Sequence, residues 1–167
     1  MKYTFAPMNR KYANDIASWH YDGIYSFYDG AADAHDLTIL MDTENRRDTL
    51  KAALNEDDEL VGRATFYTED DEFWLSLYLR PDLTGQGLGH EFASECVNYA
   101  ISHYELTRHT IKLAVALFNQ RAINVYQRAG FVEINRTIRD TPVGQMDFIE
   151  MEKRVPTDCC GSSRCSQ

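Results

Sequence analysis

Three glycines at alternate positions constrain this chain more than any other feature. They lie in Leu79–His90 (LRPDLTGQGLGH), between an apolar run that ends near Leu79 and a run with helical spacing that starts at Glu91. Glycine adopts a positive φ without steric cost, so the segment can form a tight turn whose N–H groups point the same way. The helix that follows brings the positive end of its dipole to this turn. The sequence therefore predicts an anion site at a strand-to-helix junction, large enough for a pyrophosphate.

The size and charge of the chain restrict its class. With 167 residues it has the length of one domain that buries a sizeable core, and we place this domain at residues 2–154. Its formal net charge of -9 opposes binding to nucleic acid and to anionic membranes, which both require clustered lysine and arginine. No apolar run approaches the ~18 residues of a membrane span, and the N-terminus lacks an apolar signal core. We expect a soluble, cytoplasmic protein.

The cysteines do not form a disulfide framework. Cys96 falls on the apolar side of the expected helix, whereas Cys159, Cys160 and Cys165 lie in the last nine residues. Without a histidine partner or a ligand pair elsewhere, a soft-metal site in this tail is the weaker interpretation. We predict that residues 155–167 are disordered and that the protein requires no metal.

Periodicity and turn residues indicate a mixed sheet with helices on it. Residues 48–55 fit either a helix or a strand that pairs with its successor, and residues 20–29 are predicted to be irregular. The other expected strands are 2–6, 59–67, 73–79 and 109–118, with a terminal hairpin at 131–140 and 145–153; the expected helices are 9–19, 34–42, 91–104 and 121–129. This order predicts an α/β (α+β) domain with a mostly antiparallel sheet.

Two motifs in this order of elements resemble the GNAT superfamily of acyl-CoA-dependent N-acetyltransferases. Leu77–Gly89 is similar to the family's strand followed by Arg/Gln-x-x-Gly-x-Gly/Ala. Asn119–Phe131 (NQRAINVYQRAGF) is similar to the family's Asn-x-x-Ala-x-x-x-Tyr-x-x-x-Gly-Phe. The resemblance covers residues 2–154 and implies a sheet whose central strands splay apart. Thr84 departs from the family, which usually carries a cation or an amide at this position.

The resemblance implies a binding site for acetyl-CoA, the acyl donor. Unpaired backbone groups of Leu77 and Leu79 would bind the pantetheine amides as a further strand would. The glycine turn would hold the pyrophosphate, and Asn119 would bond the cofactor arm. The residues that we assign to this site are Leu77, Tyr78, Leu79, Thr84, Gly85, Gln86, Gly87, Leu88, Gly89, His90, Asn119 and Tyr126.

The implied reaction is direct attack of a primary amine on the acetyl thioester. The resemblance places Tyr126 beside the cofactor sulfur as a general acid, and a phenol of pKa near 10 is protonated at neutral pH. Glu72, at the start of the splayed strand, is the best local carboxylate for a general base. A main-chain N–H near Leu79 would stabilise the oxyanion.

The acceptor is the least defined part of this prediction. An aromatic cluster is a candidate acceptor site; it includes Trp19, Tyr21, Tyr25 and Tyr28. These side chains either pack in the core or bind the amine of the acceptor, which is a small molecule or the N-terminus or a lysine of a peptide. The resemblance also makes a homodimer possible.

The same residues also allow roles other than catalysis. Tyr126 can serve packing alone, and Asn119 can simply cap the next helix. The main alternative function is a non-catalytic acyl-CoA-binding or sensing module. A dinucleotide site is disfavoured because the strand that ends at residues 117–119 carries no acid there.

Overall fold

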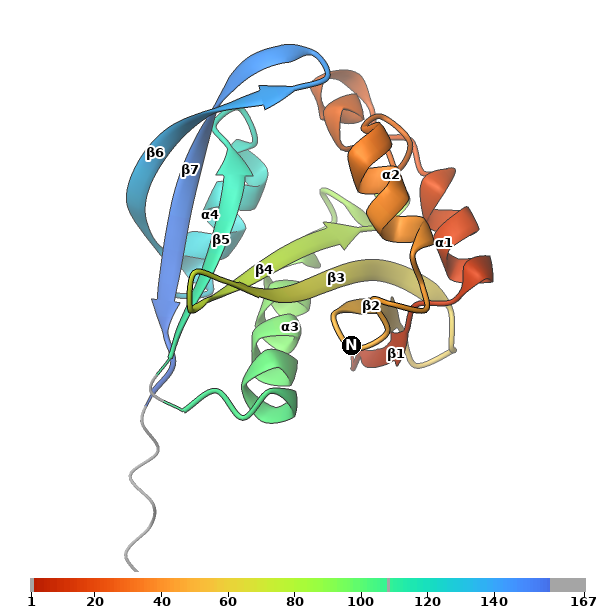
Figure 1. The fold of residues 1–167 in the computed structure, drawn as a ribbon, viewed down its shortest axis with the longest axis horizontal. Helices are drawn as coiled ribbons and strands as arrows, with labels where there is room; N and C mark the ends of the chain where they lie inside the picture. Colours follow the sequence, from red (N-terminus) through yellow and green to blue (C-terminus); the bar gives the residue numbers. More distant parts are fainter. Residues whose placement is uncertain (1, 108, 157–167) are drawn as a thin grey trace, which may run out of the picture.

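The computed structural model describes residues 2–107 and 109–156 and shows one seven-stranded sheet (Figure 1). The strand order is β1-β2-β3-β4-β5-β7-β6, and every neighbouring pair is antiparallel except β4 and β5. The strands are β1 (Thr4–Pro7), β2 (Leu50–Leu54), β3 (Leu60–Glu69), β4 (Glu72–Leu79), β5 (Thr110–Ala116), β6 (Val132–Thr141) and β7 (Gly144–Arg154). The predicted mixed, mostly antiparallel sheet is confirmed.

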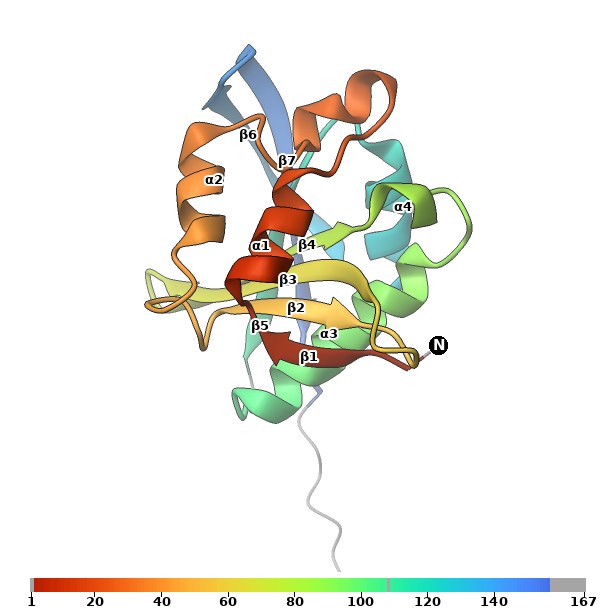
Figure 2. The same cartoon turned by 90° about the vertical axis from the view of Figure 1, so that its right-hand side faces the viewer.

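Helices cover both faces of the sheet (Figure 2). They are α1 (Arg10–Ala17), α2 (Ala34–Met41), α3 (Gly89–His103) and α4 (Gln120–Arg128), with short 3-10 helices η1 (Gly23–Tyr28) and η2 (Pro81–Leu83). The apolar sides of α3 and α4 pack on one face and form the main core, whereas α1 and α2 build a second core against β2. Within the described ranges, no helix has the length and apolar character needed to cross a membrane.

Two segments differ in detail from the sequence-based expectation. The ambiguous stretch at 48–55 contains strand β2, and all five of its residues are buried because both faces are covered. A strand buried on both faces loses the alternation that identifies a strand. The segment at 20–29, expected to be irregular, contains the 3-10 helix η1, so that expectation was wrong in part. The tail cysteines at 159, 160 and 165 lie outside the described residues, and the domain boundary at 154 stays a prediction.

One buried ion pair joins α2 to the sheet. The Arg63 side chain on β3 is 3 % exposed, and its two terminal nitrogens donate to the carboxylate of Asp36 at 3.0 and 2.9 Å. Its guanidinium also lies over the ring of Tyr78 on β4, 4.9 Å from the centroid. A buried guanidinium needs such partners because it cannot lose its charge.

We predict that Asp36→Ala lowers the free energy of unfolding by about 3–5 kcal/mol, because it leaves the buried Arg63 charge unpaired. Urea denaturation measures this loss. Asp15→Ala is the matched control, since it removes an exposed helical pair with Lys11 at 3.7 Å and should cost less than about 1 kcal/mol. Similar losses in the two variants would contradict the structural role of the pair.

Candidate active site

The sheet opens between its two parallel strands. β4 and β5 pair only at Phe73 with Ile111 and at Trp74 with Lys112. Beyond these pairs β4 continues alongside β3 as far as Leu79, and β5 continues alongside β7 as far as Ala116. The two ribbons diverge in Figure 1, and the predicted splay of the central strands is confirmed.

Backbone groups of β4 face this opening. The N–H of Arg80 donates to Val61 on β3 at 2.8 Å, so by the alternation of an antiparallel ladder Tyr78 also faces β3. Leu77 and Leu79 then direct their N–H and C=O groups into the opening. The expectation that Leu79 is unpaired is wrong for its carbonyl oxygen, which accepts a hydrogen bond from the Tyr21 hydroxyl at 2.8 Å. Leu77 therefore offers the more accessible backbone groups.

The glycine turn lies between η2 and the start of α3. Gly85 and Gly87 have φ values of 75° and 82°, in the left-handed region that favours glycine. The α3 helix begins without a side-chain cap at Leu88, so N–H groups of its first turn have no partner within the helix. This geometry suits an anion, and anion binding at this turn stays a prediction.

The polar side chains at this turn contact backbone carbonyl groups of the protein. Thr84 donates its hydroxyl hydrogen to the carbonyl of Pro81 at 2.7 Å, and Gln86 donates to the carbonyl of Asp82. His90 connects α3 to α4, with Nε2 3.3 Å from the carbonyl oxygen of Arg128. The turn thus presents its backbone rather than these side chains to a ligand.

A cation that the sequence reasoning missed lies beside the turn. A Cβ atom added at Gly85 would sit 3.6 Å from Nη1 of Arg121, the second residue of α4. The Arg121 guanidinium also lies over the Tyr25 ring, 3.7 Å from its centroid. The Arg121 guanidinium thus supplies a positive charge near the turn, which the uncharged side chain of Thr84 does not. The order of elements could have indicated this contact. The glycine turn follows β4 and Arg121 follows β5, and the segments after two adjacent parallel strands meet at the same edge of a sheet.

Tyr126 on α4 packs against the main core beside the opening. Its ring lies edge-to-face on Phe131 at 5.9 Å. Burial raises the pKa of its phenol well above 10, and the nearby Tyr28, Cys96 and Tyr78 raise it further. The group therefore stays protonated at neutral pH and can donate a proton.

Asn119 caps α4 and also reaches the centre of the site. Its Oδ1 accepts from the N–H of Ala122 at 3.1 Å, which is the capping role left open by the sequence. The buried Tyr28 hydroxyl comes close to Asn119 without completing a hydrogen bond of good geometry among the described residues. Burial raises the pKa of the Tyr28 phenol and raises that of Tyr78 to about 12.

Helix η1 places an aromatic cluster over the opening. Tyr25, Phe27 and Tyr28 pack around Phe118, which follows β5, with centroid distances of 6.1, 5.6 and 5.9 Å. Tyr28 also contacts Tyr78 of β4 at 6.2 Å, so the cluster spans both splayed strands. The structure thus brings Tyr21, Tyr25 and Tyr28 to the candidate site.

Two of the predicted site residues lie elsewhere. Trp19 packs against the second core, with residues of α1 and α2. Glu72 lies at the closed end of the strand pair and forms an ion pair with Lys112 of β5. Glu72 is five residues from Leu77, about 17 Å along the strand. The structure does not bring it to the opening, and we do not retain it as the general base.

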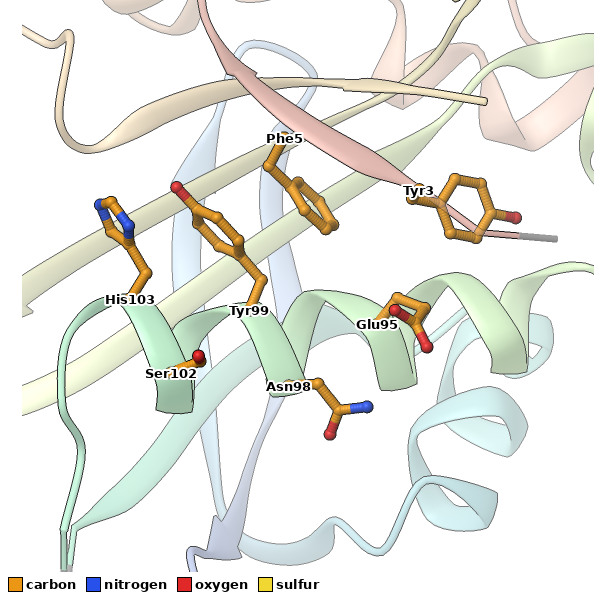
Figure 3. Close-up of a pocket in the computed structure, with 7 residues that line it drawn as sticks. All are labelled: Tyr3, Phe5, Glu95, Asn98, Tyr99, Ser102 and His103. Atoms are coloured by element: carbon orange, nitrogen blue, oxygen red, sulfur yellow. The ribbon is translucent and has the colours of Figure 1, made fainter. Parts of the chain in front are cut away.

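A separate hollow of about 520 Å³ lies between β1 and α3 (Figure 3). Its lining includes Phe5, Tyr99 and His103 and shares no residue with the opening or with the glycine turn. In the described parts of the chain, no three His, Cys, Asp or Glu side chains are grouped to hold a metal ion.

Comparison with known families agrees with this geometry. The pattern of the acetyltransferase (GNAT) family matches residues 14–131. The chain belongs to this family. No match was found among curated protein sequences.

Solved structures share the fold of this acetyltransferase. Spermidine N-acetyltransferase from Vibrio cholerae, in complex with CoA and spermine, has a TM-score of 0.67 and 17 % identity, covering 91 % of this chain and 95 % of that chain. A GNAT-family acetyltransferase from Bacillus anthracis has a TM-score of 0.67 and 13 % identity, covering 92 % and 95 %.

We predict that Arg121→Ala raises the Kd for acetyl-CoA about tenfold, because it removes the cation beside the glycine turn. Isothermal titration calorimetry measures this change. Arg128→Ala, at the exposed end of the same helix, is the control and should leave the Kd unchanged. Adding Thr84→Arg to the Arg121→Ala variant should recover most of the affinity. Equal binding by Arg121→Ala and Arg128→Ala would exclude the assigned role.

Proposed function

We propose that this acetyltransferase transfers the acetyl group of acetyl-CoA to a primary amine by direct attack in a ternary complex. The observation that carries the proposal is the opening between β4 and β5, which has a glycine turn at its wide end and the protonated phenol of Tyr126 beside it. Membership in the GNAT family supports both the donor and the reaction class.

The donor fits the site in three places. Backbone groups of Leu77 are positioned to bond the pantetheine amides, extending the sheet as an added strand does. The turn at 85–89 and the guanidinium of Arg121 suit the pyrophosphate. Asn119, whose Oδ1 caps α4, keeps its amide N–H groups for the cofactor arm.

The chemistry follows from these positions. The neutral amine attacks the thioester carbonyl carbon, and the carbonyl oxygen takes up negative charge that an N–H of Leu77 or Leu79 stabilises. When the carbon–sulfur bond breaks, Tyr126 gives its proton to the departing thiolate. The acetylated amine releases the proton that it carried, and the Tyr126 phenolate is reprotonated by solvent. Glu72 has no part in this scheme.

The acceptor that this proposal favours is a small cationic amine. We assign the aromatic rings of Tyr21 and Tyr28 to the acceptor, because aromatic faces attract ammonium groups by about 0.5–2 kcal/mol. One face of the Tyr25 ring is already covered by the Arg121 guanidinium. The net charge of -9 raises the local concentration of cations around the protein. A structurally similar protein was solved with spermine, which supports this class of acceptor.

We predict that Tyr126→Phe keeps the Kd for acetyl-CoA and lowers kcat at least tenfold, as expected for loss of a general acid. Because the pKa of Tyr126 is raised above 10, kcat of the wild type should show no descending limb from this group up to pH 10. Stopped-flow thiol release over a pH series measures kcat and its pH dependence. Unchanged turnover in the variant would remove Tyr126 from the mechanism.

A panel of amines tests the acceptor class. Thiol release from acetyl-CoA should be at least tenfold faster with polyamines or other small multivalent amines than with amino acids or short peptides. Faster acetylation of peptides would overturn the small-amine assignment. Thermal stabilisation by acetyl-CoA without thiol release on any amine would support the alternative, a non-catalytic acyl-CoA-binding module.

A further inference from the structure

The hollow between β1 and α3 has the size of a small-molecule site (Figure 3). Its volume of about 520 Å³ falls within the usual range for such pockets, roughly 300–1,000 Å³. Two segments far apart in sequence build it: Tyr3 and Phe5 come from the first strand, and Glu95, Tyr99 and His103 come from α3. The acetyl-transfer scheme uses none of these residues.

Aromatic rings form one wall of the hollow. The centroids of Phe5 and Tyr99 are 4.6 Å apart, and the Tyr99 ring stacks on that of His103 at 4.8 Å. Phe5 also meets Phe66 of β3 edge-on at 6.5 Å. Because these contacts already order the rings, a ligand can pack methylene groups on them at little further entropic cost.

A half-buried carboxylate lies next to this wall. Glu95 projects from the first half of α3, and in the view of Figure 3 it lies between Phe5 and Tyr3. Within the described part of the chain, no hydrogen bond or ion pair joins Glu95 to another residue. A carboxylate that is partly removed from water and has no counter-ion favours the binding of a cation.

The Tyr3 hydroxyl is a second polar group that lacks a partner. Tyr3 is 6 % exposed, and its hydroxyl oxygen is buried without a hydrogen bond to any described residue. Burial raises the pKa of this phenol, and the negative charges of Glu91 and Glu95 raise it further. The hydroxyl therefore lies within the field of these carboxylates. An ammonium group has three N–H donors, which suits one carboxylate and one hydroxyl oxygen together.

We propose that this hollow binds the primary ammonium group of a small organic amine, with Glu95 as its counter-ion. The ammonium donates to a Glu95 carboxylate oxygen and to the Tyr3 hydroxyl oxygen, and the carbon chain of the amine lies against Phe5 and Tyr99. The hollow extends along α3 as far as its last residue, His103, where the negative end of the helix dipole also favours a cation. The site is separate from the acceptor site between β4 and β5.

The charge of the hollow disfavours other ligands. Among the described residues that line it, only His103 can carry a positive charge, and Figure 3 shows it at the opposite end from Tyr3. An anion would meet the negative charges of Glu91 and Glu95. A neutral aromatic ligand would fill the space but would leave Glu95 without a counter-ion.

Two-dimensional NMR of the isotope-labelled full chain, titrated with butylammonium chloride, tests the site. We expect saturable shifts of the amide signals of residues 3–5 and 95–103, with a Kd of about 1–10 mM, as is usual for so small a ligand. Because the Kd is fitted to these signals alone, an amine bound at the opening does not affect it. The titration contains no acetyl-CoA, so its outcome is independent of the proposed acetyl transfer.

Ligands without the charge provide the first control. Butanol and butyrate have the same carbon chain, and each should bind at least tenfold more weakly than butylammonium to the wild type. Equal shifts with butanol would reduce the hollow to an apolar surface, and an absence of saturable shifts with butylammonium would overturn the proposal outright.

Three variants test the assigned contacts. Glu95→Gln keeps the shape of the side chain but removes its charge, and it should raise the Kd at least tenfold. Tyr3→Phe removes only the unpartnered hydroxyl and should raise the Kd about fivefold. Glu105→Gln is the matched control, because Glu105 is exposed just beyond the end of the same helix, and it should leave the Kd unchanged. Wild-type affinity in Glu95→Gln, or an equal loss in Glu105→Gln, would exclude Glu95 as the counter-ion.

Discussion

The separation of β4 from β5 after two residue pairs is the constraint on which the candidate site depends. Each strand keeps its other partner, so alternate residues of β4 stay bonded to β3 and alternate residues of β5 stay bonded to β7. The opening is therefore not a gap in a weak sheet. It is a place where two well-paired half-sheets diverge and where the backbone of Leu77 becomes available to a ligand, because a strand's alternate residues face opposite neighbours.

The elements around the opening provide the aromatic side chains that cover it. Helix η1 lays three aromatic side chains across both half-sheets, and the Tyr21 hydroxyl bonds the last carbonyl of β4. This covering lowers the polarity around the phenols of Tyr28, Tyr78 and Tyr126, whose pKa values are all raised by burial. A site that keeps its phenols protonated suits proton donation to a thiolate.

Much of the fold could be predicted from the sequence because its signals are local. The glycine turn, the cap at Asn119 and the helical spacing along α3 and α4 depend on residues that are close in the chain. Strand β2 and helix η1 were harder to predict from the sequence. The former is buried on both faces and lacks alternation, and the latter is held by contacts with Phe118 and Tyr78, which lie far away in sequence.

By itself, the sequence determined the class of the protein and predicted a candidate anion cradle and the candidate acid Tyr126, since two short motifs carry these features. The tertiary structure alone decided which side chains meet. It brought Arg121 to the glycine turn in place of a cation at Thr84, and it left Glu72 paired with Lys112 at the closed end of the strands. The physical reason is that proximity to the opening depends on where β4 and β5 part, and strand pairing is a long-range property that no local pattern records.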